Sequence, residues 1–129
     1  MTWDLEQLET LFAKQQDWVI HTENGCLFVT NEDGLDAYVA VSGAQIVIES
    51  ILFASSAVSD TAALDRQILK THQVFPLTTI GITCVEGEDY YMAFGALSSQ
   101  SKAESVEIEI QTLFDNVTAF LDAYEDYLK

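Results

Sequence analysis

The chain has 129 residues, the length of one domain, and 49% of them are hydrophobic, which is enough for a core without metals or disulfides. Its 21 acidic side chains face only five basic ones, so the net charge at pH 7 is −16. Five scattered cations cannot displace the counterions of nucleic acid or hold an anionic membrane, so we expect no nucleic-acid partner. No apolar run approaches the ~20 residues of a membrane helix, and no signal peptide is visible. We therefore expect a cytoplasmic protein without membrane insertion, folded as a single α+β domain over residues 1–129.

The first third of the chain predicts a helix followed by an antiparallel meander. Thr2 is a candidate N-cap, and apolar residues at helical spacing continue toward Gln16. Four segments rich in β-branched and aromatic residues follow, separated by short turns. Strands joined by such short connections are antiparallel. The expected strands are Trp18–Thr22, Cys26–Thr30, Ala37–Val41 and Gln45–Phe53.

A second helix and a hairpin come next. Ser59 or Asp60 can cap this helix, which should end before Phe75 because the residue preceding a proline is disfavoured in helical space. Gly81, inside the strand that follows, indicates a bulge or a close approach of the backbone. The two expected strands, joined around the acidic segment Glu86–Asp89, are Thr78–Val85 and Tyr90–Leu97.

The chain ends in a long predicted helix. Ser101 and Glu104 have the spacing of a capping box, and an apolar stripe at helical spacing runs from Val106 to Leu128. This predicts a helix of about 27 residues, or ~40 Å. The expected fold class is α+β, an antiparallel sheet with flanking helices in the order α-β-β-β-β-α-β-β-α.

An aromatic and methionine strip is the main candidate for protein binding. Because strand side chains alternate, Tyr90, Met92 and Phe94 should share one face and Tyr91 the other. Phe75 lies just before the hairpin. A strip of this kind is a common protein-binding surface when exposed, and core when a helix covers it, and the sequence leaves both readings open. The predicted protein-binding residues are Phe75, Tyr90, Tyr91, Met92 and Phe94.

No catalytic constellation is visible in the sequence. His72 and Asp89 form the only candidate pocket pair, and neither lies beside a nucleophile motif. We therefore predict no catalytic residues, no metal site and no cofactor. Cys26 and Cys84 match no metal spacing and are expected to be two reduced core thiols.

Several segments of the chain resemble one bacterial family. They are Leu69–His72, Pro76-Leu77, Gly81-Ile82, Asp89–Tyr91, Phe94–Ser98 and Glu107–Asn116. These segments are similar to YjfI-like bacterial proteins, a family of unknown function, and the resemblance covers essentially the whole chain. It implies a small cytoplasmic protein, and a link to envelope stress, since members are sometimes encoded near relatives of the phage-shock membrane-stress protein.

The order of elements and the acidic charge are similar to type III secretion chaperones. That resemblance implies a homodimer that holds a client protein. The first hypothesis is therefore a noncatalytic protein-binding module, chaperone- or adaptor-like, linked to envelope stress. One alternative is an enzyme of unrecognised type that uses a pocket near His72. Another is an acidic regulatory subunit that binds a basic partner.

Overall fold

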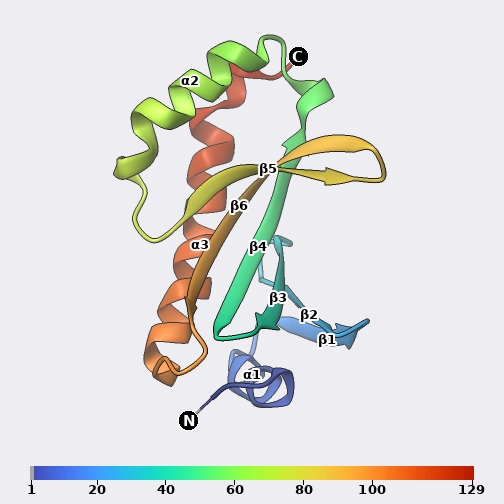
Figure 1. Cartoon of the computed structure of the whole chain (residues 1–129), viewed down its shortest axis with the longest axis vertical. Helices are drawn as coiled ribbons and strands as arrows, with labels where there is room; N and C mark the ends of the chain where they lie inside the picture. Colours follow the sequence, from blue (N-terminus) through green and yellow to red (C-terminus); the bar gives the residue numbers. More distant parts are fainter. Residues whose placement is uncertain (1) are drawn as a thin grey trace.

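The computed structural model describes residues 2–129 and shows a twisted antiparallel sheet with helices on one side (Figure 1). The expected α+β class and element order are confirmed. The sheet has six strands in the spatial order β1-β2-β3-β4-β6-β5. The helices and strands are α1 (Leu5–Phe12), β1 (Val19–Glu23), β2 (Cys26–Thr30), β3 (Asp36–Ser42), β4 (Gln45–Ala54), α2 (Thr61–Thr71), β5 (Thr79–Val85), β6 (Glu88–Ser98) and α3 (Ala103–Ala123).

The meander and the later hairpin join into one sheet because β6 pairs with β4. β1 and β5 are therefore the two edge strands. The bulge predicted at Gly81 is not there, since Gly81 pairs in register with Met92. Instead the register shifts in β4, between Ile51 and Phe53. The alternative expectation for Gly81, a close approach, fits better, because an added Cβ would lie 3.3 Å from the Phe94 ring.

The first helix begins later than predicted. Asp4, not Thr2, is the N-cap, and its carboxylate accepts from the Gln7 N–H while the Gln7 side chain accepts from the Asp4 N–H. This reciprocal pair satisfies two backbone donors at once, which a threonine two residues earlier cannot do. Trp3 is buried instead, and its indole N–H donates to the carbonyl of Ser101 at 2.7 Å.

The connection from α2 to β5 contains a residue with an unfavourable backbone conformation. Asp60 caps α2, and it is one of the two residues predicted for this role. The helix ends at Thr71, and a single 3-10 turn follows before Phe75 becomes extended. Leu77 then has φ +67°, a conformation that costs a branched side chain about 1–3 kcal/mol. The buried Asn116 amide offsets this cost by donating to the carbonyl of Pro76 (2.9 Å) and to the Thr78 hydroxyl (2.8 Å).

The second hairpin turns more tightly than predicted. Val85 pairs with Glu88, so only Glu86 and Gly87 form the turn, and β6 begins at Glu88 rather than Tyr90. Both turn residues have positive φ, +51° and +82°. Two-residue turns of this type match the right-handed twist of the strands that they join.

The last helix is shorter than predicted. It begins at Ala103 with Lys102 as N-cap and without a side-chain cap bond, so the expected capping box of Ser101 is wrong. It has 21 residues and gives way to a 3-10 turn at Glu125–Tyr127. At this point the Tyr124 hydroxyl bonds the Thr71 hydroxyl at 2.8 Å, which ties the end of α3 to the end of α2.

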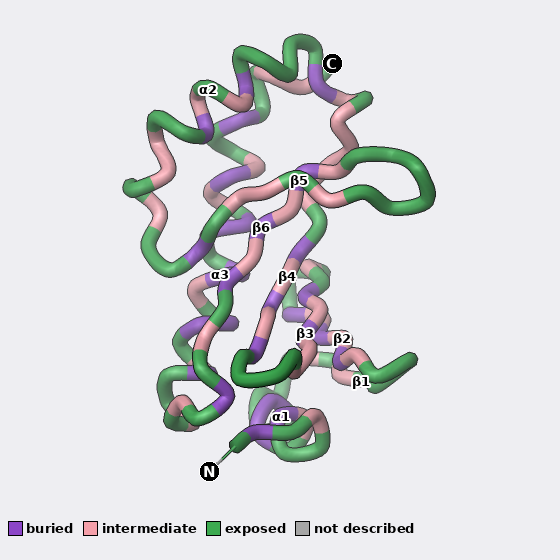
Figure 2. Tube along the Cα trace, viewed as in Figure 1, coloured by how far each residue is buried: buried purple, intermediate pink, exposed green. Residues whose placement is uncertain are grey.

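The core lies between the sheet and the helices, and Figure 2 shows the strands alternating between buried and less buried positions. One set of alternate strand residues is almost fully buried against the helices. Its members include Leu27, Val29, Ala37, Val39, Ile46, Ile48, Tyr91 and Ala93. The opposite set faces away from the helices.

Candidate functional site: an uncovered sheet face

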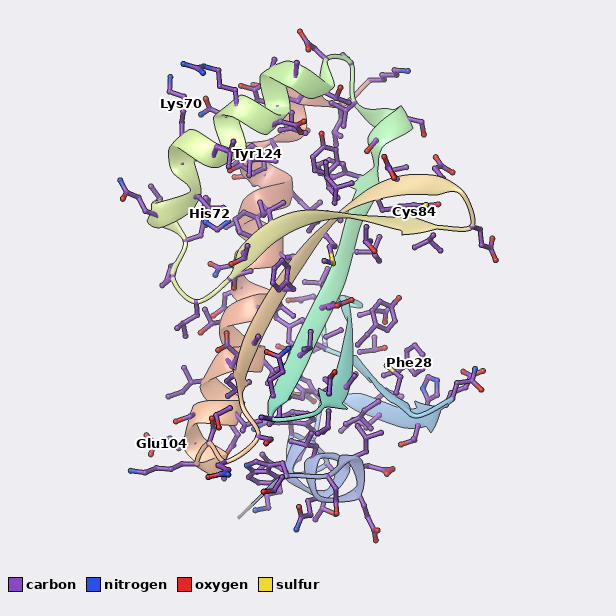
Figure 3. All side chains as sticks on the ribbon, in the orientation of Figure 1. Phe28, Lys70, His72, Cys84, Glu104 and Tyr124 are labelled. Atoms are coloured by element: carbon purple, nitrogen blue, oxygen red, sulfur yellow. The ribbon has the colours of Figure 1, made fainter. Side chains whose placement is uncertain are left out.

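The face of the sheet opposite the helices carries a row of rings. His21 stacks on Phe28 with ring centroids 4.9 Å apart, and Phe28 meets Tyr38 edge-on at 5.1 Å. The register continues this row from Tyr38 to Glu49 and then to Phe94. Figure 3 shows Phe28 on the side of β2 away from α3. Five neighbouring strands thus contribute to one continuous surface, called here the uncovered face.

The predicted strip divides between the two faces of β6. Tyr90, Met92 and Phe94 are half-buried and lie on the uncovered face, as their alternation predicts. Tyr91 is buried on the helix side, and its hydroxyl donates to the Asp65 carboxylate on α2. The pKa of Tyr91 is raised, chiefly because the side chain is buried and also because of this hydrogen bond. Both structural alternatives are therefore realised, one on each side of the strand.

Two of the predicted protein-binding residues do not lie on the uncovered face. Tyr91 is covered by α2, and Phe75 packs on Phe120 of α3 with ring centroids 4.4 Å apart. Both therefore belong to the packing between the sheet and the helices. A role in binding stays a prediction for Tyr90, Met92 and Phe94.

His72 and Asp89 are not brought together. The His72 Nε2 accepts from the Ile80 N–H at 3.1 Å, at the start of β5, whereas Asp89 pairs with Cys84 four residues further along. That separation is about 13 Å at the rise of a β-strand. Figure 3 shows His72 and Cys84 toward opposite ends of β5. The His72 nitrogen is engaged by a backbone donor, so it is not free to act as a general base.

The two cysteines are free and occupy different environments. Cys26 lies half-buried on the uncovered face, where its thiol donates to the Val39 carbonyl at 3.5 Å. Burial raises the pKa of Cys26, which keeps it as a neutral thiol. Cys84 is exposed near the hairpin turn, and Cys26 lies outside the core, so the expectation of two core thiols is wrong.

The uncovered face carries carboxylates among its rings as well as at its ends. Glu49 stands between Tyr38 and Phe94, and Asp36 accepts from the Thr30 hydroxyl at 2.6 Å. Burial and the nearby Asp36 charge raise the pKa of Tyr38. Among residues 2–129, no group of three or more His, Cys, Asp and Glu side chains is placed to hold a metal ion. The uncovered face therefore combines apolar rings with acidic side chains.

Two features of the helix side escaped the sequence reasoning. Glu109 of α3 is only 7% exposed and packs against Gly95, and its Oε2 has no hydrogen-bond partner within residues 2–129. Asn116 lies on the same face of α3, seven residues on. Both interrupt the apolar stripe at positions that face the sheet, and that interruption was the available signal. No helix within residues 2–129 is long and apolar enough to cross a membrane.

Solved structures of three other proteins or complexes share this fold. YbjN of E. coli, a candidate transcription regulator, superposes with a TM-score of 0.74 at 14% identity over 97% of this chain and 96% of that chain. A HopA1–SchA chaperone–effector complex has a TM-score of 0.63 at 9% identity over 87% and 88%. An ExsC–ExsE complex has 0.63 at 12% identity over 98% and 97%. At such identities the likeness shows the fold alone. This fold is the one predicted from the order of elements, similar to that of type III secretion chaperones.

Relatives by sequence are uncharacterized YjfI proteins. Those of Escherichia coli K12 and O157:H7 are each 30% identical to this chain, over 98% of both sequences. A family model, DUF2170, described as an uncharacterized protein conserved in bacteria, matches residues 2–128. The resemblance inferred from the sequence is thereby confirmed. The chain belongs to the DUF2170 family of bacterial proteins.

Proposed function

We propose that this protein is a noncatalytic protein-binding module, chaperone- or adaptor-like, that receives a partner on its uncovered face. The observation that carries the proposal is the row of apolar and aromatic side chains left without a covering layer across β2, β3, β4 and β6. Its centre includes Phe28, Tyr38, Ile51, Met92 and Phe94. A highly charged, soluble chain that leaves such a face open has a surface suited to another protein.

The fold supports the same proposal. Two of the similar structures are complexes, one of them between a chaperone and its effector. Apolar contact with the uncovered face would supply affinity, while the charge of −16 would set encounter rate and partner choice. A partner with apolar side chains flanked by Lys or Arg fits both properties. We further propose that the module works as a homodimer.

The test is recovery of the partner from the protein's own cells. The tagged chain is purified at low and at high salt, and bound proteins are identified by mass spectrometry. A double variant, Tyr90→Ala with Met92→Ala, removes two side chains from the uncovered face. The matched control, Ile108→Ala, truncates an exposed apolar residue on α3. Circular dichroism checks that each variant is folded.

We expect a stoichiometric partner that survives high salt, is lost in the double variant and is kept in the control. Loss of the partner at moderate salt would instead favour the acidic regulatory subunit, because exposed charges are screened there. A protein recovered without any partner would contradict the proposal for the resting cell. A link to envelope stress stays a prediction, which an envelope-stress protein as partner would support.

A further inference from the structure

The stretch from α2 to β5 differs from the rest of the chain in its charge. Residues 61–85 contain one acidic side chain, Asp65, and two basic ones, Arg66 and Lys70. All the other acidic side chains and three of the five basic ones lie elsewhere, so the remainder carries a net charge of −17. Two copies of this chain therefore repel each other over most orientations, and least where residues 61–85 form the surface.

The same stretch contains most of the exposed large apolar side chains. Within residues 2–129, eight such side chains are exposed, and five of them fall between residues 69 and 85. Leu69 is 77% exposed and Ile82 is 53% exposed, and both line a groove of about 300 Å³ between α2 and β5. Val74 and Leu77 lie in the segment that joins the two elements. These four residues are called the α2–β5 patch.

The outer edge of β5 also carries backbone N–H and C=O groups that do not pair with β6. β5 is the last strand of the sheet, and the Ile80 N–H donates to the His72 Nε2 rather than to β6. In an antiparallel ladder the outward-pointing groups recur at every second residue. The N–H and C=O of Ile82 therefore point outward too, beside the groove. An apolar edge strand with free backbone groups is a natural place for another chain to dock.

We propose that a second copy of this chain covers the α2–β5 patch in a two-fold symmetric dimer. The distribution of charge favours a second copy of this chain over a basic partner at the α2–β5 patch. A basic partner gains more from the surfaces that carry the acidic side chains, whereas another copy meets an apolar surface of low charge along residues 61–85. In a two-fold interface each patch faces its own equivalent, so the Leu69 and Ile82 side chains of both copies leave water together. This inference rests on the homodimer proposed above and gives it an interface. The interface uses β5 and α2 and shares no side chain with the uncovered face.

The test is the oligomeric state by sedimentation velocity across low to high micromolar concentrations. Leu69→Glu places a good helix former at an exposed helix position, so the fold is retained while the interface receives two buried charges. We expect the dimer dissociation constant to rise at least about a hundredfold, since each desolvated charge costs several kcal/mol. Ile108→Glu, at a 50% exposed position on α3, is the matched control and leaves the dissociation constant unchanged within about threefold.

Salt gives a second readout that a charge-driven complex would not share. Because the copies repel each other and the contact is apolar, the dimer tightens from low to high salt as the repulsion is screened. Ile82→Thr, which keeps a β-branched residue in β5, should weaken the dimer in the same direction as Leu69→Glu. A wild-type chain that stays monomeric at high concentration and high salt overturns the proposal. So does a dimer that Ile108→Glu dissociates as strongly as Leu69→Glu.

Discussion

From the burial of the Glu109 carboxyl we predict that its contribution to the free energy of unfolding becomes less favourable as the pH rises. Its side chain is 7% exposed, and its Oε2 finds no hydrogen-bond partner in the described part of the chain. Burial away from water raises the pKa of Glu109 above the ordinary value of 4.5. The folded protein therefore holds the proton more tightly than the unfolded chain, and each unit of pKa difference is worth about 1.4 kcal/mol.

The sign of the pH dependence follows from this difference. Below pH 4.5 the carboxyl is protonated in both states and Glu109 costs little. As the pH rises toward the raised pKa of the folded state, the unfolded chain releases its proton first, and stability is lost over that window. Above the folded-state pKa the loss is complete. Replacing Glu109 by Gln removes the titration while keeping the shape of the side chain.

We expect Glu109→Gln to be more stable than the wild type at pH 7, because a neutral amide buries no charge. The gain is about 1.4 kcal/mol for each unit by which folding raises the pKa of Glu109. Near pH 4 the two proteins should be equally stable. Urea unfolding at a series of pH values, followed by tryptophan fluorescence, measures the difference, and all other carboxylates cancel in it. Glu104→Gln, on the exposed first turn of α3, is the control and should change stability by at most about 1 kcal/mol at pH 7. A Glu109→Gln difference that does not vary with pH would refute the reasoning.

Two further predictions concern the packing of α3 on the sheet. In Gly95→Ala, the new Cβ would lie 2.5 Å from the Glu109 Oε2 and 3.1 Å from its Cδ, so we expect a loss of about 1–3 kcal/mol in urea unfolding. The loss should shrink in a Glu109→Ala background, and equal losses in both backgrounds would show that the clash is not with Glu109. Asn116→Ala removes both bonds to the loop before β5 and should cost about 2 kcal/mol, with faster amide exchange at Thr78 as the local readout.

The order of elements could be predicted because each signal for it is local. Two-residue alternation marked the strands, and the Asn24-Gly25 turn and Asp60 cap lie within a few residues of the elements that they bound. The start of α1 was missed although its signal is local, since Asp4 and Gln7 have the spacing of a capping box. At the start of α3 a tertiary contact competes with the local cap. Trp3 donates to the Ser101 carbonyl across 98 residues, and no capping pattern in the sequence contains that contact.

The candidate site could be predicted only in part, for a physical reason. Alternation separates Tyr91 from its neighbours Tyr90 and Met92, but it does not say which side a helix will cover. That side is decided by a contact between Tyr91 and Asp65, 26 residues away on α2. Likewise His72 reaches the backbone of β5, and the pairing register then places Asp89 several residues beyond it.

The distribution of charge separates the two proposed surfaces. Asp36 and Glu49 lie on the uncovered face, so a second copy of this acidic chain is disfavoured there and a basic partner is favoured. Arg66 and Lys70 bring the region beside Leu69 close to neutrality, so apolar contact between copies meets little repulsion. Because the two surfaces share no side chain, variants of each should act independently, as expected for separate sites. A dimer would then present two uncovered faces, and a partner with two binding segments would gain from occupying both.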